Sequence, residues 1–254
     1  MPEITVSGEG VYFQDTLRSA QHTIVFLHGP GGSHRTWRDQ WAGLKGGARL
    51  VIPDLPGHGG SGGPARKSIE EYAAWLREFV AELELKRYVL AGHSMGGAIA
   101  QQAAIDGHPG IEALILTCTG AKLRVHPAII DGIANRFRGF APELVEMMMA
   151  KEPDIFLRDD VTSDVLSTRA VTFLSDFAAC DAFDIRERLA GIHVPALIIA
   201  GDQDRLTPLK YGEYLAARIR GGVLKIIPGT GHLAMLERPV EVNNVITSFL
   251  QSLG

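Results

Sequence analysis

Cysteine is scarce in this chain of 254 residues, which contains only Cys118 and Cys180. Two cysteines cannot build the framework of a disulfide-rich secreted domain, and no Cys or Cys/His spacing typical of a zinc site occurs. No run of about 18 apolar residues is present, and the first residues lack the basic and apolar stretches of a signal peptide. We therefore expect no membrane span and a location in a reducing compartment, the cytoplasm.

The chain also lacks a marked excess of either charge. Its 25 Lys and Arg residues and 29 Asp and Glu residues give a net charge of −4. This balance argues against partners such as nucleic acid or an anionic membrane surface. Hydrophobic residues make up 46% of the sequence, which is enough for a sizeable core and argues against disorder.

Short apolar runs alternate with amphipathic runs along the chain. Six apolar runs have the length and two-sided hydrophobicity of buried parallel strands. They are Thr23–Leu27, Arg49–Ile52, Tyr88–Ala91, Ala113–Thr117, Ala196–Ala200 and Val223–Ile227. Two earlier segments, Ile4–Ser7 and Val11–Gln14, predict a hairpin at one edge of the sheet. The predicted fold class is α/β, with a doubly wound, mostly parallel sheet of eight strands.

The alternation stops between residues 120 and 190, where no convincing strand pattern occurs. Helical patterns are present there at Pro127–Phe137, Pro142–Ala150 and Thr162–Cys180. Loops as long as this are usually functional or disordered, and the phenylalanines of the segment argue against disorder. We predict a core domain made of residues 1–119 and 191–254, and a helical cap, or lid, at 120–190 after the sixth strand.

The strongest local signal is the segment Gly92–Gly97, which has Ser94 as its third residue. It follows an expected strand and precedes a helical pattern. Glycines permit the strained backbone of a sharp strand-to-helix turn, and this turn places the serine oxygen at the positive end of a helix. We interpret Ser94 as a nucleophile. The alternative is a glycine-rich turn whose serine only caps the helix.

Two later positions supply the partners that a serine nucleophile needs, because its hydroxyl reacts only when a base takes its proton. His232 follows the expected strand at 223–227 and can act as the base. Asp202 and Asp204 follow the strand at 196–200, and either carboxylate can orient the histidine. All these positions lie at carboxyl ends of parallel strands, where open α/β sheets place their sites.

Together with the segments Leu27–Gly29 and Asp54–Ser61, these motifs resemble the α/β-hydrolase family over essentially the whole chain except the cap. The resemblance implies that Ser94 is the nucleophile, His232 the general base and then acid, and Asp204 the orienting carboxylate. It implies a serine esterase, similar to carboxylesterases, that needs no cofactor and no metal. A serine at the elbow excludes family members with an aspartate nucleophile, such as epoxide hydrolases and haloalkane dehalogenases.

One position departs from the family pattern. The family builds its oxyanion hole from two backbone N–H groups, the first of which belongs here to Met95. The second belongs to the residue after His-Gly, which is Pro30 and has no N–H. We expect the loop to shift so that the Gly31 N–H donates instead. The alternatives are a side chain or water in its place, or a weak oxyanion hole.

Further pocket residues are expected near the triad. His28 and His93 flank the loop and the elbow, Arg124 can bind a substrate carboxylate, and Met147 and Met148 can line an adaptable pocket. Each has a structural alternative: loop support for His28, packing for His93, an exposed position for Arg124 and helix packing for the methionines.

The leading functional prediction is hydrolysis of a small or medium carboxylic ester, or a related acyl compound, through an acyl-enzyme. The same triad can serve a carbon–carbon bond hydrolase or a cofactor-free perhydrolase. A ligand-binding receptor with weak turnover is an alternative of another class. The expected partner is a small-molecule acyl substrate, bound by a monomer or homodimer.

Overall fold

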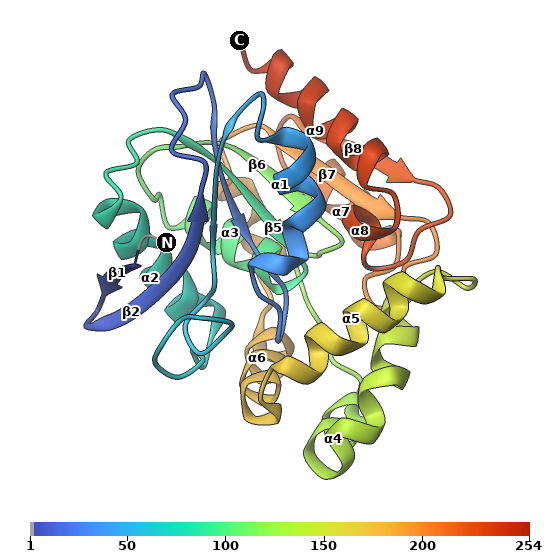
Figure 1. Ribbon diagram of the computed structural model, residues 1–254. Coiled ribbons are helices and arrows are strands. Elements are labelled where there is room, and N and C mark those ends of the chain that lie inside the picture. Colours follow the sequence, from blue (N-terminus) through green and yellow to red (C-terminus); the bar gives the residue numbers. More distant parts are fainter. Residues whose placement is uncertain (1–2) are drawn as a thin grey trace.

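The computed structural model describes residues 3–254, so the first two residues of the predicted core domain lie outside the described residues. One sheet runs through the molecule in the strand order β1-β2-β4-β3-β5-β6-β7-β8 (Figure 1). The strands are β1 (Glu3–Val6), β2 (Glu9–Asp15), β3 (Thr23–Leu27), β4 (Arg49–Pro53), β5 (Tyr88–His93), β6 (Ile111–Thr117), β7 (Ala196–Gly201) and β8 (Gly222–Ile227). β2 pairs antiparallel with β1 and β4, and the remaining pairs are parallel. The predicted eight-stranded, mostly parallel sheet is confirmed.

Helices cover both faces of the sheet, because successive residues of its buried strands point to opposite sides. In β5, Tyr88 and Leu90 join one apolar core, whereas Val89 and Ala91 join the other. The first core includes residues of α2 (Ile69–Glu82), α3 (Met95–Ile105), η2 (Arg186–Gly191) and α7 (Lys210–Arg218). The second includes residues of η1 (His34–Trp37), α1 (Arg38–Leu44), α8 (Ala234–Glu237) and α9 (Pro239–Ser252). None of the described helices is long and apolar enough to cross a membrane.

The helix α2 illustrates how the sequence sets these elements. It begins after Ser68, whose hydroxyl accepts the N–H of Glu71 and so satisfies one of the free donors of the first turn. Its buried side chains recur at helical spacing and include Tyr72 and Phe79. Because this stripe faces the core, the Tyr72 hydroxyl is carried into the interior.

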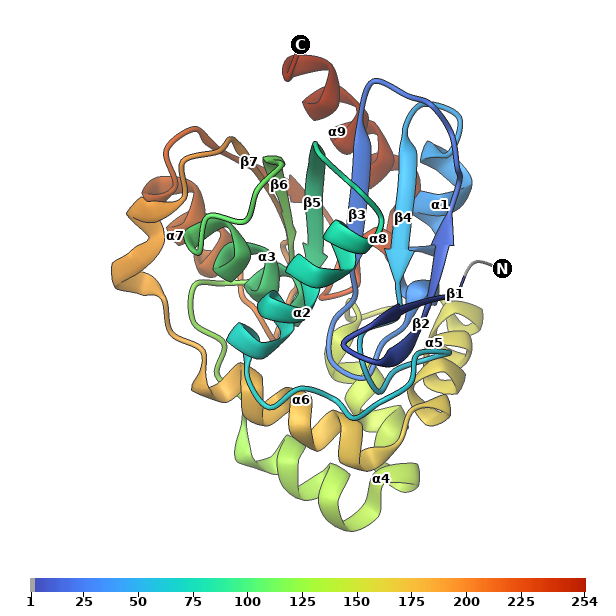
Figure 2. The ribbon, with the colours of Figure 1, turned by 90° about the vertical axis from the view of Figure 1, so that its left-hand side faces the viewer.

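Three helices occupy the segment between β6 and β7: α4 (Pro127–Met148), α5 (Ile155–Ser167) and α6 (Ala170–Ala182). Figure 2 shows them together beyond one end of the sheet. The predicted helix over Thr162–Cys180 was wrong in its bounds. The chain is extended at Thr168 and Arg169, and the Thr168 hydroxyl donates to the carbonyl oxygen of Gly31 at 2.7 Å. That the segment acts as a lid stays a prediction.

Candidate active site

Ser94 occupies a strained turn between β5 and α3. Its φ of 52° and ψ of −114° lie in a region of backbone angles that residues other than glycine rarely adopt. The turn is possible because its glycines, which have no side chain, allow neighbouring backbone segments to approach closely. A Cβ at Gly92 would lie 2.2 Å from the Gly96 backbone, and one at Gly96 would lie 2.3 Å from the Leu27 oxygen. The Ser94 N–H donates to the Thr117 oxygen at 3.0 Å, which ties the turn to β6.

His232 and Asp204 form a buried pair beside this turn. The Nδ1 of His232 lies 2.8 Å from the Oδ2 of Asp204, which also accepts the Thr207 hydroxyl at 2.7 Å. The other oxygen, Oδ1, accepts the N–H groups of Leu206 and Thr207 at 2.9 and 2.8 Å. A carboxylate at this place keeps the proton of the neutral imidazole on Nδ1, so the lone pair is on Nε2.

Asp204 is ionised at neutral pH. Burial alone would raise the pKa of its carboxyl, but the attraction to His232 and the hydrogen bonds from His232 and Thr207 outweigh burial and lower this pKa to about 2. The pair can therefore accept a proton at Nε2 of His232 and hold the resulting imidazolium beside a fixed negative charge.

The competing carboxylate, Asp202, lies away from this pair. Its side chain is exposed and its Oδ1 accepts the N–H of Gly229 at 2.8 Å. It stabilises the turn before His232, and it does not contact the imidazole in the described structure. The structure thus brings Asp204 to His232, and not Asp202.

The backbone around His232 is fixed from two sides. Its N–H donates to the Met148 oxygen at the end of α4, at 2.6 Å. Its carbonyl oxygen accepts Nε2 of His93 at 2.9 Å, and the two rings lie 4.8 Å apart. Burial lowers the pKa of His93 to about 3, so this imidazole is neutral and its Nε2–H is the donor.

The thiol of Cys118 completes the surroundings of the pair. Its sulfur and the ligand atoms of Asp204 and His232 lie within 4.8 Å of one another, close enough to consider a metal. Burial raises the pKa of the Cys118 thiol well above its usual range, so the sulfur is protonated and a poor ligand. Because Asp204 and His232 are hydrogen-bonded to each other, their side chains are better suited to proton transfer than to metal binding.

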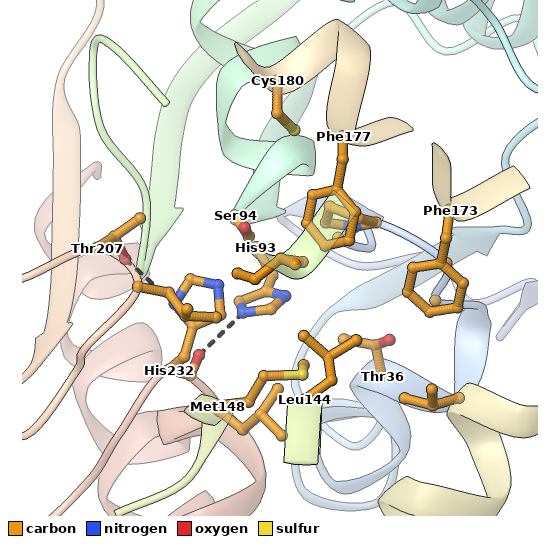
Figure 3. A pocket seen from close by; sticks show the side chains of 18 of the residues that line it. Thr36, His93, Ser94, Leu144, Met148, Phe173, Phe177, Cys180, Thr207 and His232 are labelled. Atoms are coloured by element: carbon orange, nitrogen blue, oxygen red, sulfur yellow. Dashed lines mark hydrogen bonds between the residues drawn. The ribbon is translucent and has the colours of Figure 1, made fainter. Parts of the chain in front are cut away.

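A cavity of about 190 Å³ opens in front of Ser94 and His232, between the sheet and the helices α4–α6 (Figure 3). Its lining is mainly apolar and includes Leu144, Met148, Val161, Val165, Phe173, Phe177 and Leu233. Charged side chains at the cavity are few. Arg38 pairs with Asp160 and Asp164, and Arg205 donates to the Met149 oxygen. Arg124 has no hydrogen bond or ion pair within the described residues.

Three of the five further residues predicted for the pocket line this cavity, namely His93, Arg124 and Met148. His28 and Met147, the other two, are not among the residues that line it. His28 is fully buried, with Nδ1 2.8 Å from the Gly29 oxygen and Nε2 accepting the Leu55 N–H at 3.0 Å, so it supports the loop. Met147 lies one helical position away from Met148 and packs against the neighbouring apolar core.

The predicted oxyanion role of Gly31 is contradicted by the structure. The Gly31 N–H donates to Oδ2 of Asp176 at 2.8 Å, and the Gly32 N–H donates to the Gly29 oxygen at 3.1 Å. Pro30 lacks an N–H, so residues 30–32 present no free amide. The Met95 N–H, at the first position of α3, has no partner within its own helix.

Asp176 is a residue that the sequence analysis missed. It lies in α6, is fully buried, and contacts Gly31, His58 and Tyr72. A signal was present, because Asp176 interrupts an apolar helical pattern between Phe173 and Phe177. A charged residue at a buried helix position requires partners, although the sequence does not reveal which ones.

Comparisons with known proteins agree with this fold. A family model described as the alpha/beta hydrolase family matches residues 24–245. A solved structure of a thermophilic esterase is 31% identical, with a TM-score of 0.89 over 100% of this chain and 98% of that one. The uncharacterized hydrolase YugF of Bacillus subtilis (strain 168) is 28% identical and covers 97% of this chain and 96% of its own. The 3-oxoadipate enol-lactonase 1 of Acinetobacter baylyi is 27% identical, covering 91% and 89%.

Proposed function

Because the chain is a hydrolase that belongs to the alpha/beta hydrolase family, we propose that it cleaves small or medium carboxylic esters with Ser94, His232 and Asp204 as a catalytic triad. One observation carries the proposal. Ser94, on its strained turn, and His232, which is paired with the buried Asp204, line the same cavity. A serine that merely capped a helix would need neither the pair nor the cavity.

The proposed reaction begins with attack of the Ser94 oxygen on the substrate carbonyl. Nε2 of His232 takes the serine proton, and Asp204 stabilises the imidazolium that forms. The Met95 N–H donates to the oxyanion of the tetrahedral intermediate. His232 then gives its proton to the leaving alcohol, and water hydrolyses the acyl-enzyme through the same histidine.

The cavity supports an acyl group of modest size. An engineered cavity of about 150 Å³ accepts benzene, so about 190 Å³ fits a benzoyl group or a chain of about six carbons. The apolar lining suits such a group. We place the leaving group toward the opening, where the exposed Arg124 can meet a polar or anionic end. The helices of residues 120–190 are proposed as the lid over this cavity.

The test is covalent labelling followed by substrate profiling. A fluorophosphonate should label the wild-type protein at Ser94 and leave Ser94→Ala unlabelled, as read by peptide mass spectrometry. p-Nitrophenyl esters of increasing chain length should then show a maximum of kcat/KM at or below about six carbons, as the cavity volume indicates.

Lactone, dienoic diketone and peracid-forming substrates belong in the same panel. One relative is an enol-lactonase by name, and a lactone is an internal ester. Faster turnover of a diketone or of peracid formation than of every ester and lactone would replace the ester proposal with that activity. Absence of both labelling and turnover would favour a ligand-binding role.

A further inference from the structure

The carboxylate of Asp176 joins three separate parts of the core to α6. Its Oδ2 accepts the Gly31 N–H and lies 2.8 Å from Nε2 of His58, and its Oδ1 accepts the Tyr72 hydroxyl at 2.6 Å. Gly31 belongs to the loop after β3, His58 to the loop after β4, and Tyr72 to α2. Asp176 does not line the cavity, so any effect on catalysis is transmitted through these neighbours.

The protons of this cluster can be assigned from its contacts. Both ring nitrogens of His58 face oxygens, because Nδ1 lies 2.9 Å from the Pro56 carbonyl and Nε2 faces Asp176. A carbonyl oxygen only accepts, and Asp176 already accepts from two other groups, so the contacts fit an imidazolium beside a carboxylate. Burial alone would lower the pKa of His58, but the attraction to Asp176 outweighs it and raises the pKa.

Three residues of the segment between β6 and β7 fix the conformation of Gly31. Asp176 binds its N–H, and the Thr168 hydroxyl donates to its carbonyl oxygen at 2.7 Å. The ring of Phe173 lies over its α-carbon, since a Cβ there would be 2.0 Å from that ring. The φ of +61° is open to glycine and strained for most other residues.

We propose that Asp176 is a positioning residue that acts through Gly31, holding the Gly31 N–H away from the oxyanion site and leaving Met95 as the backbone donor. This inference rests on the proposed function. The Pro30–Gly31 peptide can rotate once the carboxylate no longer binds it, because glycine tolerates both orientations. Asp176 therefore limits the rate of acyl transfer from a place that substrate does not touch.

Asp176→Asn is a selective test because the cluster dictates how the new amide is oriented. Its oxygen takes the place of Oδ1 and keeps the Tyr72 hydroxyl, while its NH₂ takes the place of Oδ2 and donates to a neutral His58. The NH₂ then faces the Gly31 N–H, and two donors repel each other. The substitution keeps two contacts of the cluster and breaks the one to Gly31.

Kinetics on p-nitrophenyl acetate give the first readout. Asp176→Asn should raise kcat at least about fivefold, below the ceiling of about 10²–10³ that one oxyanion donor supplies, and leave KM within about twofold. Tyr72→Phe is the matched control. It removes a donor to Oδ1 but leaves the Gly31 contact, so kcat should stay within about twofold of wild type.

Pro30→Gly supplies an N–H at the usual donor position without touching Asp176, and it should also raise kcat. Combined with Asp176→Asn it should raise kcat little further, because both changes supply the same missing donor of the oxyanion hole. A kcat for Asp176→Asn that is unchanged or lower, in protein that still reacts with fluorophosphonate, would overturn the inference.

A crystal structure of the phosphonylated wild-type protein decides the question even where a variant fails to fold. The expected result is a Gly31 N–H still on Asp176 and a phosphonyl oxygen bound by the Met95 N–H. A Gly31 N–H on the phosphonyl oxygen would overturn this inference alone. Failure of the fluorophosphonate to label Ser94 at all would instead remove the proposed function.

Discussion

Replacing Asp204 by asparagine tests the proposed triad most sharply, because the structure fixes how the new amide is oriented. Oδ1 of Asp204 accepts two backbone N–H groups, from Leu206 and Thr207. The amide oxygen must take that place, since an NH₂ there would face two donors. The NH₂ of Asp204→Asn is therefore turned toward Nδ1 of His232, where Oδ2 lies in the wild-type protein.

The consequence is a change of tautomer at the proposed base. An NH₂ facing Nδ1 requires a lone pair there, so the proton of the neutral imidazole moves to Nε2. An Nε2 that carries a proton cannot accept one from Ser94. The expected loss in kcat is about 10⁴, which corresponds to about 5 kcal/mol of activation free energy, with the fold kept.

The assay is steady-state hydrolysis of p-nitrophenyl acetate near neutral pH, with circular dichroism as the check on folding. Asp202→Asn is the matched control, because its carboxylate contacts only the Gly229 N–H among the described residues and should cost less than about tenfold. A loss for Asp202→Asn that equals or exceeds the loss for Asp204→Asn would refute the assignment of the acid. A folded Asp204→Asn variant with near wild-type kcat would refute the tautomer argument itself.

Three further outcomes are expected. Ser94→Ala and His232→Ala should each remove nearly all esterase activity, and the double variant should be no slower than either single one, since the residues act as a unit. Losses that multiply would contradict the coupled mechanism. The free energy of unfolding, measured with urea across pH, should be greatest near the ordinary histidine pKa of 6.5. Toward acid it falls because burial lowers the pKa of His28 to about 4 and that of His93 to about 3, so the unfolded chain takes up protons that the folded one resists. Above pH 6.5 the free energy of unfolding falls as the pH rises through the raised pKa of His58, because the folded protein then loses a proton that it binds more tightly than the unfolded chain does. His58→Gln should make this alkaline decrease smaller. An unchanged alkaline decrease in His58→Gln would refute the ion pair. Finally, Arg124→Gln should lower kcat/KM for an ester with an anionic leaving group about tenfold and spare its neutral analogue, with Arg138→Gln, at another exposed arginine, as control. Equal effects on both esters would show that Arg124 does not recognise the anionic leaving group.

The sequence predicts the sheet well because buried parallel strands are locally encoded. The run at 88–91 is apolar on both faces and is followed by a glycine-rich turn, and these features alone indicate β5 and the start of α3. The position of Ser94 follows from the same local pattern. Predicting that Asp204 and His232 lie near Ser94 also required the rule that the carboxyl ends of parallel strands meet at one edge of the sheet.

The sequence could not predict the hydrogen bond between Gly31 and Asp176. These residues lie 145 positions apart, and the bond depends on how α6 packs over the loop after β3. No local pattern encodes that packing, since the same loop sequence with another helix above it would leave Gly31 unbound. The error at residues 162–180 has the same origin, because Thr168 leaves the helical pattern where it meets the Gly31 oxygen.

The contacts of α4 and α6 bear on how the chain should be divided for experiment. Met148, at the end of α4, accepts the N–H of His232, and Asp176, in α6, accepts the N–H of Gly31. One contact supports the proposed base and the other sets the loop beside the proposed nucleophile. A chain from which residues 120–190 were removed would therefore lose more than a cover over the cavity. It would leave the backbone of His232 without its acceptor and His58 without its carboxylate, so a loss of activity in such a deletion could not be assigned to substrate access alone. A point substitution at Asp176 avoids this ambiguity, because it changes one hydrogen-bonding group and leaves the cavity in place.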